Sequence, residues 1–470
     1  MSKFTGVLLT FLSLIFLNSA SFADDHKQPN VIIIYTDDQG YQDLGCYGSP
    51  NIKTPVLDNM AKEGIRFTDF YVTASVCCPT RASLLTGRYS VRNGIGGVIL
   101  PDSKGLADEE VTIAELLKTE GYRTACFGKW HIGDIGASVP TRQGFDSYFG
   151  LMFSNDMHLG GAHEFAQDAV FREGYTLEKA KADQAFNSSH PRKEVNASGR
   201  QNLVPLYEGT EIVEYPCDQG TLTRRYFDRA IDFIDAGDGE PFFIYLTPNM
   251  PHIPLFASEQ FEGTSEQGLY GDVIEEIDWN TGRLVEHLKK RGIDQDTLVI
   301  YTSDNGPWLS FGDHAGSAYP LRGGKFTNYE GGVRVPCIMR WPGKWPAGVE
   351  TDAIVSILDF FPTLAGYAGA EVEPKRLDGM NIAPFLENPN KPLGREVMLY
   401  TKKRDIVGIR KGDWKYLPNG GGRNPTEADG AELFNLSSDI GENENLVDSH
   451  PEIAVELASL LTKMVSEMED

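Results

Sequence analysis

The stretch "NVIIIYTDD", residues 30–38, decides the fold class, because a short, continuous apolar run ends in two aspartates. A strand with one exposed face alternates apolar and polar residues, whereas this run does not, so it predicts a strand buried on both faces. The stretch "DTLVIYTSDNG", residues 296–306, has the same form. Further apolar strands are predicted within residues 123–127 and 241–247. Several such strands indicate a mainly parallel sheet that helices cover on both sides.

Helices separate these strands along the chain. Three of them are predicted over residues 54–64, 111–121 and 269–292. Thr54 followed by Pro55 suits the N-cap and the first turn of a helix. Thr112 and Glu115 have the spacing of a capping box, in which each side chain bonds the backbone N–H of the other residue. The alternation of strands and helices predicts an α/β sandwich.

A second, smaller region follows the Pro/Asn-rich linker "LENPNKPLG", residues 386–394. The stretch "DIVGIRKGDWKYLP" predicts a hairpin that turns at Gly412 and Asp413, and residues 451–469 predict an amphipathic helix. We therefore predict an α/β protein with a large mixed, mostly parallel sheet sandwiched by helices, and a smaller C-terminal antiparallel sheet plus helix. The predicted parts are a signal peptide at 1–23, a main domain at 24–388 and a C-terminal subdomain at 389–470.

The first residues have the form of a secretory signal peptide. Lys3 is its positive end, residues 7–17 form a short apolar core, and the stretch that ends at Ala23 suits cleavage. The apolar core is too short to cross a bilayer, no later segment is long and apolar enough, and no cysteine follows the core to carry a lipid. We expect a periplasmic or secreted protein without a membrane anchor.

The composition limits the possible partners. The chain has 470 residues and a net charge of -24, from 67 acidic and 43 basic residues, and the basic residues form no run. Nucleic-acid binding is therefore not expected. The acidity indicates either a solvated surface or an acidic binding face. If the substrate is an anion, the active site has to be basic against the field of the whole protein.

Polar residues follow the ends of four predicted strands. They are Asp37 and Asp38, Lys129 and His131, His252, and Asp304 and Asn305. Such residues often only form turns. However, binding sites in open α/β sheets form outside the carboxyl ends of the strands, so we expect these four segments to converge. Carboxylate and amide oxygens suit a hard cation, calcium or magnesium, better than zinc.

The stretch "SVCCPTRASLLTGR", residues 75–88, places two cysteines before a proline. Pro79 would open a helix, so Cys77 and Cys78 would lie where backbone N–H groups and the helix dipole favour an anion. Local positive charge would come from Arg81, Lys129 and Lys325. Together with the oxygen ligands, this set predicts a metal-assisted site for a tetrahedral oxyanion ester.

The same stretch carries a family signature. Residues 77–87 match the pattern C-x-P-[ST]-R-x-x-x-x-T-G of type I sulfatases. The chain resembles the arylsulfatase A and N-acetylgalactosamine-6-sulfatase group of the alkaline phosphatase superfamily over roughly residues 30–445, least clearly in 155–220. The resemblance implies that a maturase oxidises Cys77 to formylglycine, whereas Cys78 fills a variable position. The alternatives are a disulfide from either cysteine, or Cys77 acting as a thiolate.

The resemblance also implies a mechanism and a role for each motif residue. One hydroxyl of the hydrated formylglycine attacks sulfur and displaces the alcohol, and the other then helps to expel sulfate. The implied calcium ligands, with magnesium possible, are residue 77, Asp37, Asp38, Asp304 and Asn305. The resemblance implies that Arg81 orients the nucleophile and that His131 acts as a base. It implies that Lys129 and Lys325 contact the sulfate, and that His252, with Lys325, protonates the leaving oxygen. Taken alone, His252 would more often be a structural loop histidine and Lys325 an exposed lysine, and only the surrounding motifs favour a role in the site.

The substrate side is less determined. Relatives build their substrate pocket from segments that correspond here to Asn155, Asp156, His158, Trp308, His314 and Arg322. These residues fit a pocket or an ordinary surface, and Trp308 fits a sugar platform or a packed loop. The resemblance implies hydrolysis of a sulfate ester on a carbohydrate, such as a carrageenan-type galactan or a glycosaminoglycan fragment, by an exo-acting enzyme. The alternatives are a phosphonate or phosphate diester hydrolase and a glycan-binding protein without activity.

Overall fold

Three parallel strands form the centre of the molecule. The computed structural model describes residues 28–172, 174–373 and 377–469, so the predicted signal peptide lies outside the described residues. Strand β1 (Asn30–Thr36) is buried along its whole length. It pairs in parallel with β10 (Thr297–Ser303) on one side and with β9 (Phe242–Thr247) on the other. The two stretches that predicted doubly covered strands are therefore neighbours in one sheet.

The large sheet is mixed, with a parallel centre. Beyond β9 it continues in parallel through β4 (Arg123–Lys129) and β5 (Ser147–Leu151), whereas β11 (Cys337–Arg340) runs antiparallel to β10. Its strand order is β12-β2-β11-β10-β1-β9-β4-β5-β7-β8-β6. The other members are β2 (Ile65–Phe67), β6 (Phe165–Phe171), β7 (Leu206–Glu208), β8 (Glu211–Tyr215) and β12 (Val349–Thr351). The predicted mixed, mostly parallel sheet is confirmed.

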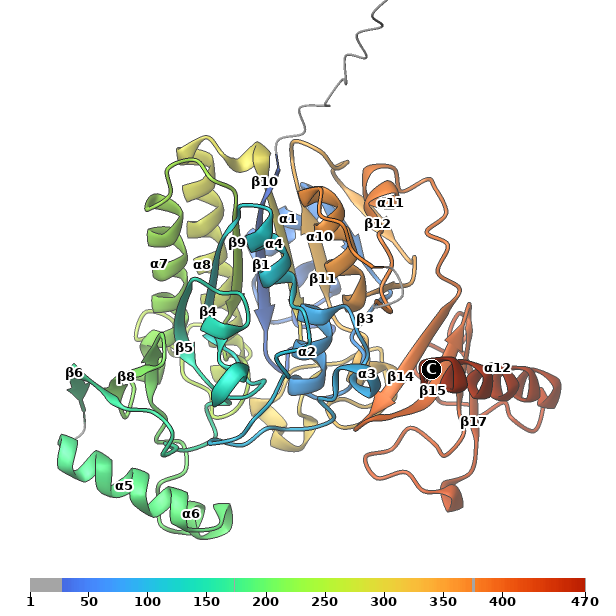
Figure 1. The fold of residues 1–470 in the computed structure, drawn as a ribbon. Helices are drawn as coiled ribbons and strands as arrows, with labels where there is room; N and C mark the ends of the chain where they lie inside the picture. The colour runs from blue at the N-terminus through green and yellow to red at the C-terminus, as the bar shows by residue number, and fades with distance from the viewer. Residues whose placement is uncertain (1–27, 173, 374–376, 470) are drawn as a thin grey trace, which may run out of the picture.

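Helices form two groups with the sheet between them, as Figure 1 shows. One group contains α1 (Pro55–Lys62), α7 (Leu222–Asp235) and α8 (Leu269–Arg291). The other contains α2 (Cys77–Thr86), α4 (Ile113–Thr119) and α10 (Phe360–Ala368). The other elements of this part are α3 (Ser90–Asn93), α5 (Leu177–Ser189), α6 (Arg192–Ala197), α9 (Glu330–Val333), α11 (Ala383–Glu387), β3 (Phe70–Tyr71) and β13 (Val355–Ser356). Among the described residues, no helix combines the length and apolar character that crossing a bilayer requires.

The helix starts show how the predicted caps are used. In α4 the capping box forms, because Glu115 N–H donates to Thr112 Oγ1 at 3.1 Å and Thr112 N–H donates to Glu115 at 2.7 Å. In α1, Thr54 occupies the N-cap position but its side chain does not cap. The free Leu57 N–H instead donates to the Asp278 carboxylate of α8 at 2.8 Å. The first turn of α1 is thus capped by a neighbouring helix.

A four-stranded antiparallel sheet follows in the C-terminal part. It contains β14 (Val397–Lys402), β15 (Asp405–Lys411), β16 (Trp414–Leu417) and β17 (Glu432–Asn435), and α12 (Pro451–Glu469) packs against it (Figure 1). Lys411 pairs with Trp414 around the predicted turn, where Gly412 has a φ of 56°. The predicted C-terminal antiparallel sheet plus helix is confirmed.

A buried ionic network joins this sheet to the main part of the fold. Lys415 of β16 is fully buried, and its Nζ lies 2.9 Å from Glu330 of α9 and 2.8 Å from Glu442. The Tyr400 hydroxyl donates to Glu330 at 3.0 Å, and Glu442 accepts the Glu330 backbone N–H at 2.7 Å. The ammonium group of Lys415 therefore forms ion pairs with two buried carboxylates from two different segments.

We expect Lys415→Gln to destabilise the protein by about 3 kcal/mol or more, because among the described residues it leaves the buried Glu442 without its cation and Glu330 with only the ion pair to Arg334 at 3.5 Å. Chemical denaturation and the melting temperature measure the loss. Lys411→Gln is the matched control, since Lys411 of β15 and its partner Glu456 of α12 are both exposed, and the melting temperature should hardly change. Equal melting temperatures for the two variants would contradict the structural role of Lys415.

Candidate active site

The predicted polar residues meet at the carboxyl ends of the central strands. Asp37 and Asp38 follow β1, Asp304 and Asn305 follow β10, Lys129 ends β4, and His252 lies on the loop after β9. All of them are buried, with exposed fractions of 3% or less. Because these strands are parallel neighbours, their ends deliver side chains from four distant parts of the sequence to one place.

Helix α2 brings Cys77 to this cluster. The sequence predicted that the helix begins at Pro79. It begins at Cys77 instead, so Pro79 lies inside the first turn. Its missing N–H has no cost there, because the first N–H groups of a helix have no intrahelical partner. Cys77 Sγ lies 3.4 Å from His131 Nδ1, and Cys78 Sγ accepts the Ile99 backbone N–H at 3.3 Å. All six cysteines lie within the described residues and are free, so the disulfide alternative is wrong for this structure.

Three cations pair with the three carboxylates of the cluster. Lys129 Nζ lies 2.5 Å from Asp37, and Lys325 Nζ lies 2.7 Å from Asp38. The Arg81 guanidinium donates twice to Asp304 Oδ2, at 2.9 and 2.7 Å, and once to the Lys129 carbonyl at 2.8 Å. The carboxylates and cations thus neutralise one another without leaving positive charge for an anionic substrate.

Burial and neighbouring charges separate the acidities of two of these carboxylates. Burial raises the pKa of Asp304 well above its usual value, and the neighbouring charge of Asp37 adds to the effect. Burial acts in the same direction on Asp37, but the positive charges of Lys129, His252 and Arg81 outweigh it and lower the pKa of Asp37. The pKa values of these two neighbouring carboxylates are thus shifted in opposite directions, which is typical of a metal-binding or catalytic site.

Some oxygens of the cluster have no donor. The Asn305 side-chain N–H donates to Asp38 at 2.7 Å, yet Asn305 Oδ1 and Asp37 Oδ1 are buried and accept no hydrogen bond from the described residues. Buried acceptors without a donor are costly unless something else satisfies them. Asp38 has a φ of 63°, an uncommon conformation that holds its carboxylate in the cluster. An all-oxygen set with two free acceptors fits a hard divalent cation such as calcium or magnesium.

The two histidines stand beside different partners. His131 Nε2 lies 3.1 Å from the Ile99 carbonyl, and its Nδ1 faces Cys77. Burial lowers the pKa of His131, with Lys129 contributing in the same direction. His252 Nε2 lies 3.7 Å from Asp38 Oδ2. His131 therefore lies against Cys77, and His252 lies against the carboxylate of Asp38.

Ser154 is a site residue that the sequence analysis missed. Its Oγ accepts a hydrogen bond from Lys129 Nζ at 3.3 Å and lies 3.2 Å from His252 Nε2, so it bridges two predicted site residues. It lies three residues past the end of β5, a fifth parallel strand that the sequence analysis did not identify. Recognising that strand would have drawn attention to the polar residues behind it.

Only part of the predicted substrate set lies at the cluster. Asn155 donates to the Pro254 carbonyl at 2.8 Å, close to His252. The Trp308 ring packs against His252 with centroids 5.8 Å apart and lies 4.5 Å below Lys325 Nζ, and its indole N–H is buried without an acceptor among the described residues. Of the predicted substrate residues, these two lie beside the cluster.

The other predicted substrate residues have different surroundings. Asp156 pairs with Arg192 of α6 at 3.4 Å. His158 is buried, and its Nδ1 has no partner among the described residues. His314 is exposed, and Arg322 Nη1 donates to the Glu442 carbonyl at 2.8 Å. None of these four contacts the cluster in the described part of the chain, and Arg322 helps to hold the C-terminal segment instead.

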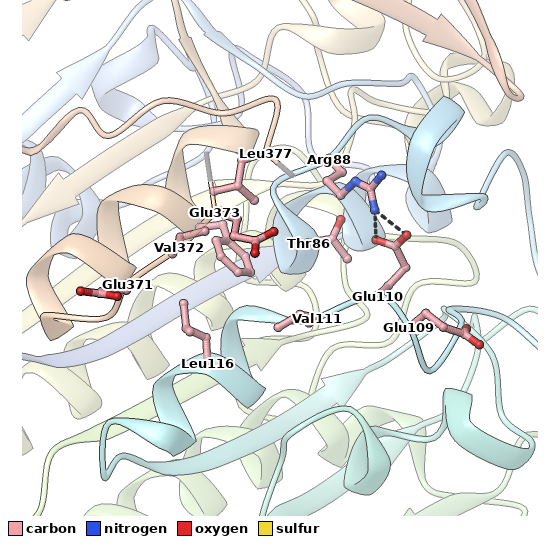
Figure 2. Close-up of a pocket in the computed structure, with 11 residues that line it drawn as sticks. Thr86, Arg88, Glu109, Glu110, Val111, Leu116, Glu371, Val372, Glu373 and Leu377 are labelled. Carbon is pink, nitrogen blue, oxygen red and sulfur yellow. Dashed lines mark hydrogen bonds and ion pairs between the residues drawn. The ribbon is translucent and has the colours of Figure 1, made fainter. Parts of the chain in front are cut away.

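A pocket of about 570 Å³ lies elsewhere on the molecule, as Figure 2 shows. It is lined by Thr86, Arg88, Glu110, Val111, Leu116 and Phe361, among others. Thr86 ends α2 whereas Cys77 begins it, and a helix of ten residues spans about 15 Å. The Arg88 side chain there pairs with Glu110 at 2.7 Å. No predicted site residue lines this pocket, so it is separate from the cluster.

Comparisons with known proteins agree with this geometry. Residues 29–370 match the Sulfatase family, and residues 324–469 match the family "N-sulphoglucosamine sulphohydrolase, C-terminal". Arylsulfatase A of Bos taurus is 37% identical over 453 residues, which cover 91% of this chain and 85% of that protein.

Two solved structures extend the similarity to the fold. "Ps i-CgsB in complex with k-i-k-neocarrahexaose" is 32% identical with a TM-score of 0.75, covering 94% of this chain and 93% of that one. "PsFucS1 sulfatase from Pseudoalteromonas sp." is 28% identical with a TM-score of 0.78, covering 95% and 92%. The sheet and the polar cluster at its strand ends are those of a hydrolase of the alkaline phosphatase superfamily. Within it, the chain belongs to the sulfatase family, whose members hydrolyse sulfuric esters.

We expect Ser154→Ala to lower kcat/KM for a sulfate ester roughly tenfold, because hydrogen bonds to charged groups contribute about 1.5–3 kcal/mol. Steady-state kinetics measure the loss, and the melting temperature should stay close to that of the unmodified protein. Ser189→Ala, an exposed position on α5, is the matched control and should leave the kinetics unchanged. Unchanged kcat/KM in Ser154→Ala would exclude Ser154 from the site.

Proposed function

We propose that the protein removes sulfate from a sulfated saccharide, with residue 77 matured to formylglycine. The observation that carries the proposal is the place of Cys77, at the first residue of α2 with its Sγ 3.4 Å from His131 Nδ1. A residue there stands at the positive end of a helix and beside a base, which favours attack on an anionic ester. When matured by a formylglycine-generating maturase, residue 77 supplies a hydrated aldehyde whose hydroxyl is the nucleophile.

The hydrogen bond of His131 determines which of its nitrogens acts as the base. The Ile99 carbonyl, 3.1 Å from Nε2, can only accept a hydrogen bond, so Nε2 carries the proton of the neutral ring. Nδ1 then has a free lone pair, and this atom faces residue 77. His131 is therefore prepared to take a proton from the side chain of residue 77.

Arg81 positions the nucleophile helix. Its guanidinium is fully buried and is held between Asp304 and the Lys129 carbonyl, so it cannot move without breaking three hydrogen bonds. Because Arg81 lies one turn after Cys77 on α2, it holds residue 77 in place beside the strand ends. Its charge also stabilises negative charge that develops near residue 77.

The oxygen cluster would hold a calcium ion, with magnesium as the other hard cation of suitable chemistry. The residues that would hold it are Asp37, Asp38, Asp304 and Asn305, together with the side chain of residue 77. When bound, the cation supplies Lewis acidity and positive charge for a sulfate oxygen. Lys129 and Lys325 pair with Asp37 and Asp38, so their charges would become available to the sulfate group only when a cation neutralised these carboxylates.

The leaving group would depart on the side of His252. Its Nε2 lies beside Ser154 and Asp38, and Lys325 shares Asp38, so both can deliver a proton to the departing sugar oxygen. Trp308 packs against His252 on this side, where a sugar ring would lie. Protonation of the leaving oxygen matters because an alcohol is a poor leaving group.

The proposed substrate is a chain-end sugar of a sulfated galactan, such as a carrageenan fragment, or of a glycosaminoglycan. The signal-peptide form of the first residues supports a periplasmic or secreted enzyme, which would meet such polymers outside the cell. The relative solved with k-i-k-neocarrahexaose supports a sulfated saccharide as the class of ligand. The loops 155–163 and 308–322 would line the pocket, with Asn155 and Trp308 nearest to the reacting group.

We expect matured protein to hydrolyse at least one sulfated saccharide faster than any phosphonate or phosphate diester. Cys77→Ala should abolish this turnover because it removes the nucleophile, whereas Cys78→Ser should retain it. A turnover panel that varies sulfate position and sugar epimer, with peptide mass spectrometry of residue 77, provides the measurement. A pocket that hydrogen-bonds one hydroxyl pattern should discriminate strongly between epimers. Faster diester hydrolysis would replace the proposed function with the phosphonate alternative.

We expect a chelator to lower both the activity and the melting temperature, because four buried ligand residues would lose the cation that satisfies their oxygens. Added calcium or magnesium should restore both, and sodium should not. Asn305→Ala should lose most of the cation-dependent rise in melting temperature. If zinc were the only metal in active protein, the hard-cation assignment would be wrong.

A further inference from the structure

Four basic residues gather beside the proposed site. We name them the mouth cations: Lys402, Lys403, Arg404 and Arg423. Lys403, Arg404 and Arg423 are exposed and Lys402 is half-buried. Within the described ranges, none of the four forms an ion pair, not even with the neighbouring Asp405. In a chain of net charge -24, these four unpaired cations form a locally positive group.

The backbone fixes these residues next to the nucleophile helix. Thr401, which precedes them, donates its N–H and its hydroxyl to the Thr73 carbonyl at 3.0 and 2.8 Å, and it forms a β-bridge with Ala74. Thr73 and Ala74 lie four and three residues before Cys77. The Lys403 carbonyl also accepts from Ser90 of α3 at 2.9 Å, and Figure 1 shows α3 beside α2 and the β14–β15 hairpin.

The side chains extend this contact toward the site. The Arg423 guanidinium lies 4.6 Å from the centre of the Phe326 ring, and Lys325 Nζ lies 5.5 Å from the same ring. Arg423 and a lysine of the cluster therefore lie near the same aromatic ring. On the other flank, the stem of Arg404 leaves no room for a side chain at Gly96, three residues before the Ile99 carbonyl that contacts His131.

The mouth cations repel one another. Lys402 donates to the Gly422 carbonyl at 3.2 Å and to the Arg423 carbonyl, which holds the Arg423 loop against the end of β14. Burial lowers the pKa of Lys402, and the charges of Lys403 and Arg423 lower it further. The fold thus holds like charges together without a protein anion to balance them, which favours binding of an external anion.

We propose that the mouth cations bind a second anionic group, a sulfate or a carboxylate, on a sugar that adjoins the one whose sulfate ester is cleaved. The inference rests on the proposed function and specifies it further. A polyanionic saccharide would be repelled by the acidic surface and attracted at this patch, so that the patch would orient the chain toward residue 77. Arg404 and Arg423 are the planar, multiple donors that suit sulfate and carboxylate.

The test compares matured wild-type protein with two double variants of equal charge. Arg404→Gln/Arg423→Gln removes two mouth cations and leaves Lys402 to hold its loop. Lys62→Gln/Lys391→Gln is the control, since both lysines are exposed and form no ion pair within the described residues. The substrates are three oligosaccharides that share one backbone and one scissile sulfate. They differ only in the sugar next to the sulfated one, which is neutral, sulfated or carboxylated.

We expect wild type to prefer one or both of the charged neighbours over the neutral one. The mouth variant should raise KM for the preferred substrate about tenfold without changing kcat, because a charge-assisted contact contributes about 1.5–3 kcal/mol. Its kinetics on the neutral-neighbour substrate should match those of wild type, and the control should match wild type on all three. Added salt should erase the preference of wild type. The charged substrate that wild type prefers shows whether the second anionic group is a sulfate or a carboxylate.

Three outcomes would overturn the inference. The first is cleavage of all three substrates by wild type with equal KM. The second is an equal loss of affinity of the mouth variant for the neutral-neighbour substrate. The third is a loss in the control variant as large as that in the mouth variant. Each of these leaves saccharide sulfatase activity, and hence the proposed function, in place. If wild type cleaves none of the saccharides while it cleaves other esters, the proposed function and this inference fail together.

Discussion

The buried guanidinium of Arg81 is the constraint on which the site depends. It joins α2, β10 and β4 in one place, because it donates to Asp304 after β10 and to the Lys129 carbonyl at the end of β4. An unpaired guanidinium at this depth would cost several kcal/mol, so the helix and both strands have to keep their relative positions. The first residue of that helix is Cys77, and its place beside His131 follows from the same arrangement.

Charge balance explains how an acidic protein forms a site for an anion. The three carboxylates of the cluster neutralise Arg81, Lys129 and Lys325, so the cluster alone offers no net attraction to sulfate. A divalent cation among the free oxygens of Asp37 and Asn305 would change that balance. The mouth cations would extend the positive region outward, along the direction from which a charged saccharide chain would approach.

Much of this fold was predictable from sequence, for identifiable reasons. Residues 31–35 and 298–301 are continuously apolar, and the strands that contain them pair at the centre of the sheet. The motif residues converge because they follow such strands. The start of α2 at Cys77 was not predictable from Pro79, since proline is tolerated throughout the first turn. Ser154 was missed because β5 was missed, and the Arg322 contact with the Glu442 carbonyl depends on a segment far away in sequence.

The central claim is that the atom attacking sulfur belongs to residue 77. The variant Cys77→Ser tests it most directly, because serine offers one hydroxyl for attack and no second hydroxyl to expel sulfate. After incubation with a cleavable sulfated saccharide, peptide mass spectrometry should find a sulfo group on residue 77, formed once per molecule and stable to the assay. Continued release of sulfate by this variant with residue 77 unmodified, or a sulfo group on another side chain, would contradict the account.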